Sequence, residues 1–220
     1  MMAKEVPGGL FITLEGPECA GKSTQGRLLA RALQSEEFRV QQVREPGGTV
    51  VGEQLRGIVK HVCGPDAVCD EAELLIFEAS RAQLVRKVIQ PSLAAGDIVI
   101  CDRFADSSVA YQGYARGLDL TLIHALNNAV VGERWPDLTF LLDLDQAAGS
   151  RRGQMRLETL FVEDRIEDES VQFHRRVREG FLRVAAENRH RFRVLDATQR
   201  IDEIHTQIMS SVTDALSTVL

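Results

Sequence analysis

A glycine-rich segment near the start of the chain has the residue pattern of a nucleotide phosphate-binding loop. Residues 16–23 read GPECAGKS, which matches GxxxxGK followed by Ser or Thr. The segment lies between an apolar β-prone run, Leu10 to Glu15, and a stretch with helical periodicity, Lys22 to Ala32. In this context backbone N–H groups and a helix N-terminus bind phosphate, Lys22 lies along the β- and γ-phosphates, and the Ser23 hydroxyl ligates Mg²⁺. The motif therefore predicts binding of a nucleoside triphosphate with Mg²⁺.

The phosphate loop is shared by kinases, GTPases, ATPase motors and nucleotide-gated adaptors. The guanine-binding motif NKxD is absent, since residues 127–130 read NNAV and lack both the lysine and the aspartate. Motor ATPases usually follow a metal-binding aspartate with a glutamate that acts as a base, but here Asp102 precedes Arg103 and Asp143 precedes Leu144. A kinase that acts on a small phosphate-bearing acceptor is therefore favoured.

Three charged residues after the loop could serve the acceptor. Arg44 ends the second expected strand, so it points from the carboxyl edge of the sheet into the crevice where open α/β folds bind ligands. There it could hold a phosphate with two hydrogen bonds, although a surface arginine before an ordinary turn has the same local sequence. Asp102 and Arg103 follow the buried-strand pattern Ile98 to Cys101. They could hold Mg²⁺ through water and contact the acceptor phosphate, or simply form an ion pair at the strand end.

Several motifs stand in the order seen in one enzyme family. After the phosphate loop come REPGGT at residues 44–49, DRFADSSVAYQ at 102–112, PDLT at 136–139 and DRIE at 164–167. In these motifs the chain resembles the bacterial thymidylate kinases, from about Leu10 to beyond Asp196. The resemblance implies a kinase that uses ATP and Mg²⁺ to phosphorylate dTMP to dTDP, which supplies dTTP for DNA synthesis. ATP would be bound by Gly16, Pro17, Glu18, Cys19, Ala20, Gly21, Lys22, Ser23 and Thr24.

The resemblance also assigns residues to the acceptor nucleotide. Phe77 and Arg81 are four apart on one expected helix and so share a face. In the family the matching Phe stacks on thymine and the matching Arg hydrogen-bonds its carbonyl, whereas a helical Phe is by default a core residue. Ser108 and Gln112 look like the positions that reach the base. Tyr111 matches the tyrosine that fills the space beside the sugar C2′ and favours deoxyribose.

An acidic residue inside the phosphate loop links the loop to a later segment. Glu18 matches the acid that in the family approaches the sugar 3′-hydroxyl and phosphate. Family members with this acid supply arginines from a lid, and the corresponding segment here is Gly149 to Asp164. Cys19 stands where most relatives have glycine, and Ser108 where Thr or Asn is more usual. The expected catalytic residues are Lys22, Arg103, Glu18 and the arginines of this segment, Arg151, Arg152 and Arg156.

These residues need a sheet that brings strand ends together. Strands are expected over Leu10–Glu15, Phe38–Val43, Asp97–Cys101, Leu138–Leu142 and Phe192–Leu195. Helices are expected over Val50–Lys60, Glu71–Ile89, Thr121–Val131, Glu167–Glu187 and Ile201–Val219, with Asp70 capping the second and Pro91 ending it. This alternation predicts an α/β fold: a five-stranded, mostly parallel sheet with helices on both faces. The resemblance makes it a three-layer P-loop NTPase fold, one domain over residues 1–220 with a mobile lid at about 149–164.

The composition indicates a folded protein with small-molecule partners. Of 220 residues, 44% are hydrophobic, and the net charge of −6 gives no electrostatic reason to bind a nucleic-acid polymer or an anionic membrane. No apolar run approaches the ~18 residues that span a bilayer, and no signal peptide is apparent, so we expect a cytoplasmic protein. The cysteines form no CxxC pair and the histidines no i, i+4 pair, so we expect no zinc site. The resembled family is typically homodimeric, and an apolar face near Thr121 to Val131 could form that contact.

Two other functions fit part of the pattern. A kinase for a different nucleotide would share most of these motifs and would be distinguished by its preferred monophosphate. A nucleotide-operated binding module would hydrolyse ATP slowly, at a rate that no monophosphate changes. A P-loop fold without a working site is the least favoured alternative, because donor and acceptor motifs are both intact.

Overall fold

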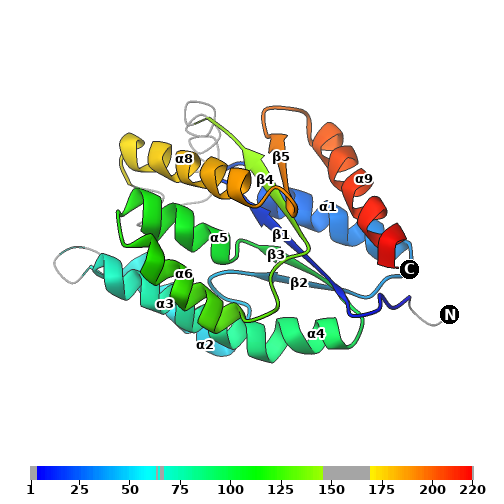
Figure 1. The fold of residues 1–220 in the computed structure, drawn as a ribbon, viewed down its shortest axis with the longest axis horizontal. Coiled ribbons are helices and arrows are strands. Elements are labelled where there is room, and N and C mark those ends of the chain that lie inside the picture. The colour runs from blue at the N-terminus through cyan, green and yellow to red at the C-terminus, as the bar shows by residue number, and fades with distance from the viewer. Residues whose placement is uncertain (1–3, 63, 65–66, 146–168, 220) are drawn as a thin grey trace.

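Five parallel strands form the central layer of the protein (Figure 1). The computed structural model describes residues 4–62, 64, 67–145 and 169–219. The strands are β1 (Leu10–Glu15), β2 (Val40–Arg44), β3 (Ile98–Asp102), β4 (Leu138–Asp143) and β5 (Phe192–Asp196). Their order in the sheet is β2-β3-β1-β4-β5, and every neighbouring pair is parallel. The predicted α/β class with a five-stranded parallel sheet is confirmed.

Helices cover both faces of this sheet. They are α1 (Lys22–Ser35), α2 (Val50–His61), α3 (Asp70–Leu84), α4 (Gln90–Ala94), α5 (Ala105–Ser108), α6 (Leu120–Val131), α8 (Val171–Glu187) and α9 (Ile201–Val219). Helices α1 and α9 lie on one face, and α3, α4, α6 and α8 lie on the other (Figure 1). No helix within the described ranges is long and apolar enough to cross a membrane.

Alternating residues of β1 pack into different cores. Leu10, Ile12 and Leu14 join the cluster formed with α1 and α9, whereas Phe11 joins the cluster beneath α4. All six residues of β1 are buried for this reason. A strand covered on both faces reads as a continuous apolar run, which is why the sequence pattern located it.

The parallel arrangement gathers the site residues at one edge. Arg44 and Leu14 both lie beside Asp102 in the strand register. The carboxyl ends of β1, β2 and β3 therefore meet, and the loops that follow them are neighbours. Open α/β sheets bind ligands at such an edge.

Three predicted helix boundaries are wrong. Asp70 does not cap α3, because Cys69 occupies the N-cap position and Asp70 is the first helical residue, where its charge suits the helix N-terminus. Pro91 does not end the helix, because a π-helical turn, Val85–Ile89, leads directly into α4. Pro91 lies at the start of α4, where its missing N–H is tolerated. The helix expected from Glu167 begins at Val171 in the structure, where the Ser170 hydroxyl accepts a cap bond from the Phe173 N–H at 3.2 Å.

Candidate active site

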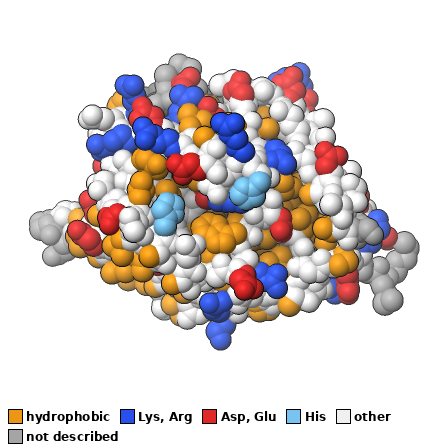
Figure 2. Space-filling view, viewed as in Figure 1, with side chains coloured by type: hydrophobic (Ala, Val, Ile, Leu, Met, Phe, Trp, Pro, Cys, Tyr) orange, Lys and Arg blue, Asp and Glu red, His pale blue; other side chains and the backbone are white. Residues whose placement is uncertain are grey.

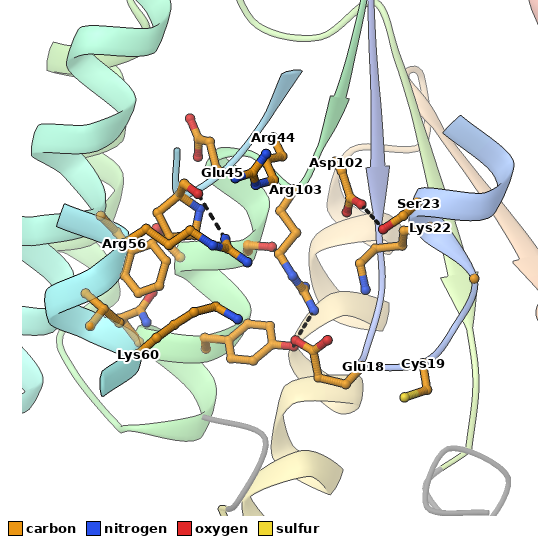
Figure 3. A pocket seen from close by; sticks show the side chains of 18 of the residues that line it. Glu18, Cys19, Lys22, Ser23, Arg44, Glu45, Arg56, Lys60, Asp102 and Arg103 are labelled. Atoms are coloured by element: carbon orange, nitrogen blue, oxygen red, sulfur yellow. Dashed lines mark hydrogen bonds and ion pairs between the residues drawn. The ribbon is translucent and has the colours of Figure 1, made fainter. Parts of the chain in front are cut away.

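A pocket of about 500 Å³ opens at the carboxyl edge of the sheet (Figure 3). Its size is that of a small-molecule site. One side is formed by the phosphate loop and the start of α1, through Glu18, Cys19, Gly21, Lys22, Ser23 and Thr24. The β2–α2 region and α3 contribute Arg44, Glu45, Pro46, Arg56, Val59, Lys60 and Phe77. The segment from the end of β3 contributes Asp102, Arg103, Ser107, Ser108, Tyr111 and Gln112.

The phosphate loop is held tightly against the sheet. A Cβ on Gly16 would lie 2.4 Å from the Leu142 carbonyl oxygen, so only glycine fits there. Gly21, the N-cap of α1, has a φ of 97°, and Cys19 adopts a left-handed φ of 58°. The buried Lys22 folds across the loop and donates to the carbonyl oxygens of Gly16 at 3.1 Å and Pro17 at 2.7 Å. Burial, together with the nearby Arg103 charge, lowers the pKa of Lys22 below its usual value.

Arg103 is fixed at a sharp corner after β3. Its φ of 69° is in the left-handed region, and its backbone N–H donates to the Leu14 carbonyl oxygen at 3.0 Å. The guanidinium donates to the Gly16 carbonyl oxygen at 2.9 Å, forms an ion pair with Glu18 and lies 5.0 Å from the centre of the Tyr111 ring (Figure 3). These contacts aim the positive charge of Arg103 at the phosphate loop.

Glu18 is ionised because of its basic neighbours. Burial alone would raise the pKa of its carboxyl group, but the charges of Arg103 and Lys22 lower it to about 2. The same ion pair raises the pKa of Arg103 although burial opposes it. The Tyr111 hydroxyl lies 3.4 Å from the Glu18 carboxylate. Glu18 therefore links the phosphate loop to Arg103 and Tyr111 on the opposite side of the pocket.

Ser23 and Asp102 provide a pair of oxygen ligands. The Ser23 hydroxyl, on the first turn of α1, donates to the Asp102 carboxylate at the tip of β3 at 2.5 Å (Figure 3). Hard oxygen donors of this kind suit Mg²⁺, which keeps several water ligands and needs few protein groups. No cluster of three or more His, Cys, Asp and Glu side chains that could hold a metal occurs among the described residues.

Basic side chains from β2 and α2 face this pair across the pocket. Arg44 donates to both carboxylate oxygens of Glu53, at 2.9 and 2.7 Å, and Glu53 also accepts from the Gly48 N–H at 2.8 Å. Arg56 donates to the Pro46 carbonyl oxygen at 2.9 Å, and Lys60 extends over the pocket from the next turn of α2 (Figure 3). The arrangement offers positive charge to a second phosphate group.

The chain matches a known enzyme family over most of its length. The family model for thymidylate kinase matches residues 14–208 of the chain. The chain belongs to the thymidylate kinase family. "Thymidylate kinase" of Oleidesulfovibrio alaskensis is 46% identical over 211 residues, which cover 94% of this chain and 99% of the relative. That of Deinococcus radiodurans is 47% identical over 207 residues, covering 94% and 97%.

A solved thymidylate kinase structure has the same fold. The crystal structure of the enzyme from Ehrlichia chaffeensis matches with a TM-score of 0.76 and 37% sequence identity, over 94% of this chain and 99% of that one. The resemblance read from the motifs and the P-loop NTPase fold are thereby confirmed.

In this thymidylate kinase family member, four of the five residues predicted around the acceptor base and sugar line the pocket. Phe77 comes from α3. Ser108 ends α5, and Tyr111 and Gln112 lie in the π-helical segment Val109–Ala115 that continues it. Spacings of three and four residues bring these three side chains to one face.

Arg81, the fifth, lies behind the pocket wall instead. It is 1% exposed and forms ion pairs with Glu45 and Glu78. Its guanidinium also donates to the Asn127 amide oxygen at 2.8 Å and to the Ser108 hydroxyl at 3.0 Å. Burial opposes its charge, but the two carboxylates raise the pKa of Arg81 above its usual value. Its structural partners connect α3, α5, α6 and the β2–α2 loop.

Arg56, Lys60 and Glu45 are pocket residues that sequence reasoning missed. Arg56 and Lys60 are four apart on α2, the helix that follows REPGGT, so a shared face was readable from their spacing. Glu45 carries no such signal, because its partner Arg81 is 36 residues away in sequence. Arg151, Arg152 and Arg156 lie outside the described residues.

Glu15 is a buried carboxyl group that supports the Arg103 corner. It accepts hydrogen bonds from the Phe104 N–H at 2.8 Å and from the Ser107 hydroxyl at 2.6 Å. Burial, and then the Asp106 carboxylate, raise the pKa of Glu15 to about 8. In an unfolded chain the same group has a pKa of about 4.5. The folded protein therefore retains a proton on Glu15 that the unfolded chain releases.

This difference predicts a pH-dependent stability. From about pH 4.5 to about pH 8 the folded state binds more protons than the unfolded state, so Glu15 makes the free energy of unfolding fall as pH rises. Glu15→Gln, which stays neutral, should remove this fall in the free energy of unfolding, which is on the order of 4 kcal/mol between pH 4.5 and pH 8. Urea denaturation at pH 5, 6.5 and 8 measures it, with the exposed Glu187→Gln as control. Parallel slopes for wild type and Glu15→Gln would show that Glu15 is ionised in the folded protein.

Proposed function

We propose that this pocket transfers the γ-phosphoryl group of ATP to dTMP, giving ADP and dTDP. The chain is a member of a transferase family, the thymidylate kinases. The observation that carries the proposal is that phosphate-loop residues and base-side residues line one continuous pocket. A donor and an acceptor nucleotide bound there would meet between Lys22 and Arg103.

On the donor side, the loop residues 16–24 would bind the ATP phosphates. Lys22 would exchange its bonds to the loop carbonyl oxygens for bonds to phosphate, since its amine lies between loop and pocket. Ser23 and Asp102 would hold Mg²⁺, directly and through water. When bound, Mg²⁺ offsets charge on the phosphate oxygens.

On the acceptor side, the monophosphate would lie among basic groups. Arg44 and Arg103 would bind it, with Arg56 and Lys60 adding positive charge from α2. Phe77 would stack on the base, Ser108 and Gln112 would bind its edge, and Tyr111 would lie against the sugar. Glu18 would approach the 3′-hydroxyl while keeping Arg103 directed at the phosphates.

The chemistry requires alignment more than a strong base. The acceptor phosphate is already ionised at neutral pH, so no side chain has to remove a proton from it. The protein's contribution is to hold the attacking and leaving oxygens in line and to place Lys22 and Arg103 where negative charge is spread. Arg103 needs no reorganisation, because the Gly16 carbonyl oxygen and the Glu18 carboxylate already orient its guanidinium.

A substrate panel tests this function. ADP release should be measured with ATP and Mg²⁺ against each nucleoside monophosphate, and dTMP should give the highest kcat/KM. A better rate with another monophosphate would make that nucleotide the acceptor. Slow hydrolysis that no monophosphate changes would identify a nucleotide-operated binding module instead.

The arginines of residues 149–164 are also proposed to take part. If Arg151, Arg152 or Arg156 contacts the phosphoryl group in transfer, its charge acts mainly in the transition state. At least one of the three single alanine variants should then lose about 10-fold in kcat, with a smaller change in the KM for ATP. Steady-state kinetics measure both constants. Full kcat in all three variants would mean that another residue supplies the positive charge at the transferred phosphoryl group, and Arg165 is the next candidate.

We further propose that the chain is a cytoplasmic, single-domain enzyme that forms a homodimer. Hydrophobic side chains gather over α3 and α6 on the left of the space-filling view (Figure 2). Leu75 on α3 is 56% exposed and Leu122 on α6 is 49% exposed. Sedimentation equilibrium would measure the oligomeric state, and a monomer at micromolar concentration would contradict the proposal.

A further inference from the structure

A buried carboxylate lies directly behind the base side of the pocket. Glu73, on the first turn of α3, is 1% exposed. It accepts a hydrogen bond at 2.8 Å from the Nε2 atom of Gln112, and Gln112 lines the pocket. The contact joins two helical segments that are distant in sequence. Gln112 lines the pocket, whereas Glu73 lies behind Gln112 and does not.

An arginine keeps this carboxylate an acceptor. Arg116 donates to Glu73 through Nε at 3.3 Å and through Nη2 at 3.1 Å. It is held in place by an ion pair with Glu169, by Asp70 at 3.3 Å and by the face of the Phe173 ring, whose centre lies 4.6 Å away. A guanidinium only donates and a carboxylate paired with it only accepts. Glu73 can therefore bind the Gln112 amide only through its NH₂ group.

The orientation of the Gln112 amide follows. Its NH₂ group faces Glu73, so its oxygen, Oε1, faces the other way. None of the described residues donates a hydrogen bond to Oε1, and Oε1 is not among the described polar atoms that are both buried and unpartnered. Since Gln112 is otherwise buried and lines the pocket, Oε1 is the acceptor that the pocket presents to a base.

We infer that Glu73 is a positioning residue that sets which pyrimidine the pocket accepts, by fixing the Gln112 amide with its oxygen toward the ligand. A lactam base such as thymine carries an N–H at ring position 3 and can donate to this oxygen. Cytosine carries a lone pair at the same position, which would face the oxygen and leave both acceptors unpaired. The inference rests on the proposed function, because it concerns the acceptor nucleotide.

Glu73→Gln tests the inference with almost no change in volume. The new amide can bind Gln112 in either orientation, so the Gln112 NH₂ group becomes free to face the pocket and donate to cytosine N3. The measured quantity is the ratio of kcat/KM for dTMP to kcat/KM for dCMP. We expect it to fall about 10-fold or more, the size of effect that one mispaired buried group produces.

Matched variants separate this role from a merely structural one. Glu169→Gln weakens the outer ion pair of Arg116 but leaves the Glu73–Gln112 bond, so its ratio should match wild type. In a Gln112→Leu background, Glu73→Gln should leave the ratio unchanged, because no amide remains to reorient. If Glu73→Gln does not fold, Arg116→Gln tests the same link, since it removes the guanidinium that holds the Glu73 carboxylate in place beside Gln112.

The outcomes are distinguishable. A wild-type protein that does not phosphorylate dTMP would overturn the proposed function itself. A wild-type dTMP kinase whose ratio survives Glu73→Gln, or falls equally in the Gln112→Leu background, would overturn the role of Glu73 alone.

Discussion

Lys22→Met should lower kcat by about 100-fold or more while the protein remains folded, since a charge that stabilises the transition state is removed. The Lys22 side chain is buried, yet its hydrogen bonds go to two carbonyl oxygens of the phosphate loop rather than to a core partner. Methionine keeps an unbranched side chain that is one atom shorter, and it removes the charge. Steady-state ADP release at saturating ATP and dTMP measures kcat, and circular dichroism with thermal unfolding measures the fold.

The control for this variant is Lys87→Met. Lys87 is exposed in the π-helical turn between α3 and α4 and does not line the pocket, so its kcat should equal that of wild type. A folded Lys22→Met protein with near wild-type turnover would contradict the assignment of the donor site. An unfolded one would show that the loop needs the lysine to close, and phosphate-binding measurements on Lys22→Arg would then separate the two roles.

The donor half of the site was predictable because its signals are local. The apolar run of β1, the loop glycines and the start of α1 are contiguous, and the structure has β1 at the predicted residues. The neighbouring positions of Arg44 and Asp102 were also predictable, because parallel topology brings the ends of their strands side by side. Cys19 shows the limit of such local inference. Its left-handed φ of 58° is a conformation that favours glycine, and the sequence alone does not show this backbone angle.

The parts that were not predicted depend on contacts between distant residues. The π-helical segments Val85–Ile89 and Val109–Ala115 have no simple period, and the second of them presents Tyr111 and Gln112 to the pocket. The pairing of Glu73 with Gln112 spans 39 residues. A buried charge has no hydrophobic pattern, so only the folded chain shows which partner satisfies it.

Arg81 is where the structure most changes the expectation drawn from the motifs. As a base contact, Arg81→Ala would raise the KM for dTMP and do little else. In the structure the side chain is buried between Glu45 and Glu78 and also binds Asn127. Its removal leaves two buried carboxylates without their cation, which typically costs 3–5 kcal/mol, about half of the stability of an ordinary domain.

Arg81→Ala should therefore lower the free energy of unfolding by about 3–5 kcal/mol as well as raise the KM for dTMP. The effect on KM follows from the hydrogen bond that Arg81 donates to Ser108, which lines the pocket. Arg81→Lys should restore little of the lost stability and should leave the KM for dTMP raised, because one ammonium group cannot replace a planar guanidinium that donates to several partners. Urea denaturation gives the free energy, and initial rates at varied dTMP and varied ATP give the two KM values.

The exposed Arg86, on the turn that follows α3, provides the matched control, and Arg86→Ala should change stability by no more than about 0.5 kcal/mol. Suppose instead that Arg81→Ala unfolds at the same urea concentration as wild type and only the KM for dTMP rises. The guanidinium would then belong to the substrate and not to the fold, because two uncompensated carboxylates cannot remain buried at no cost in free energy.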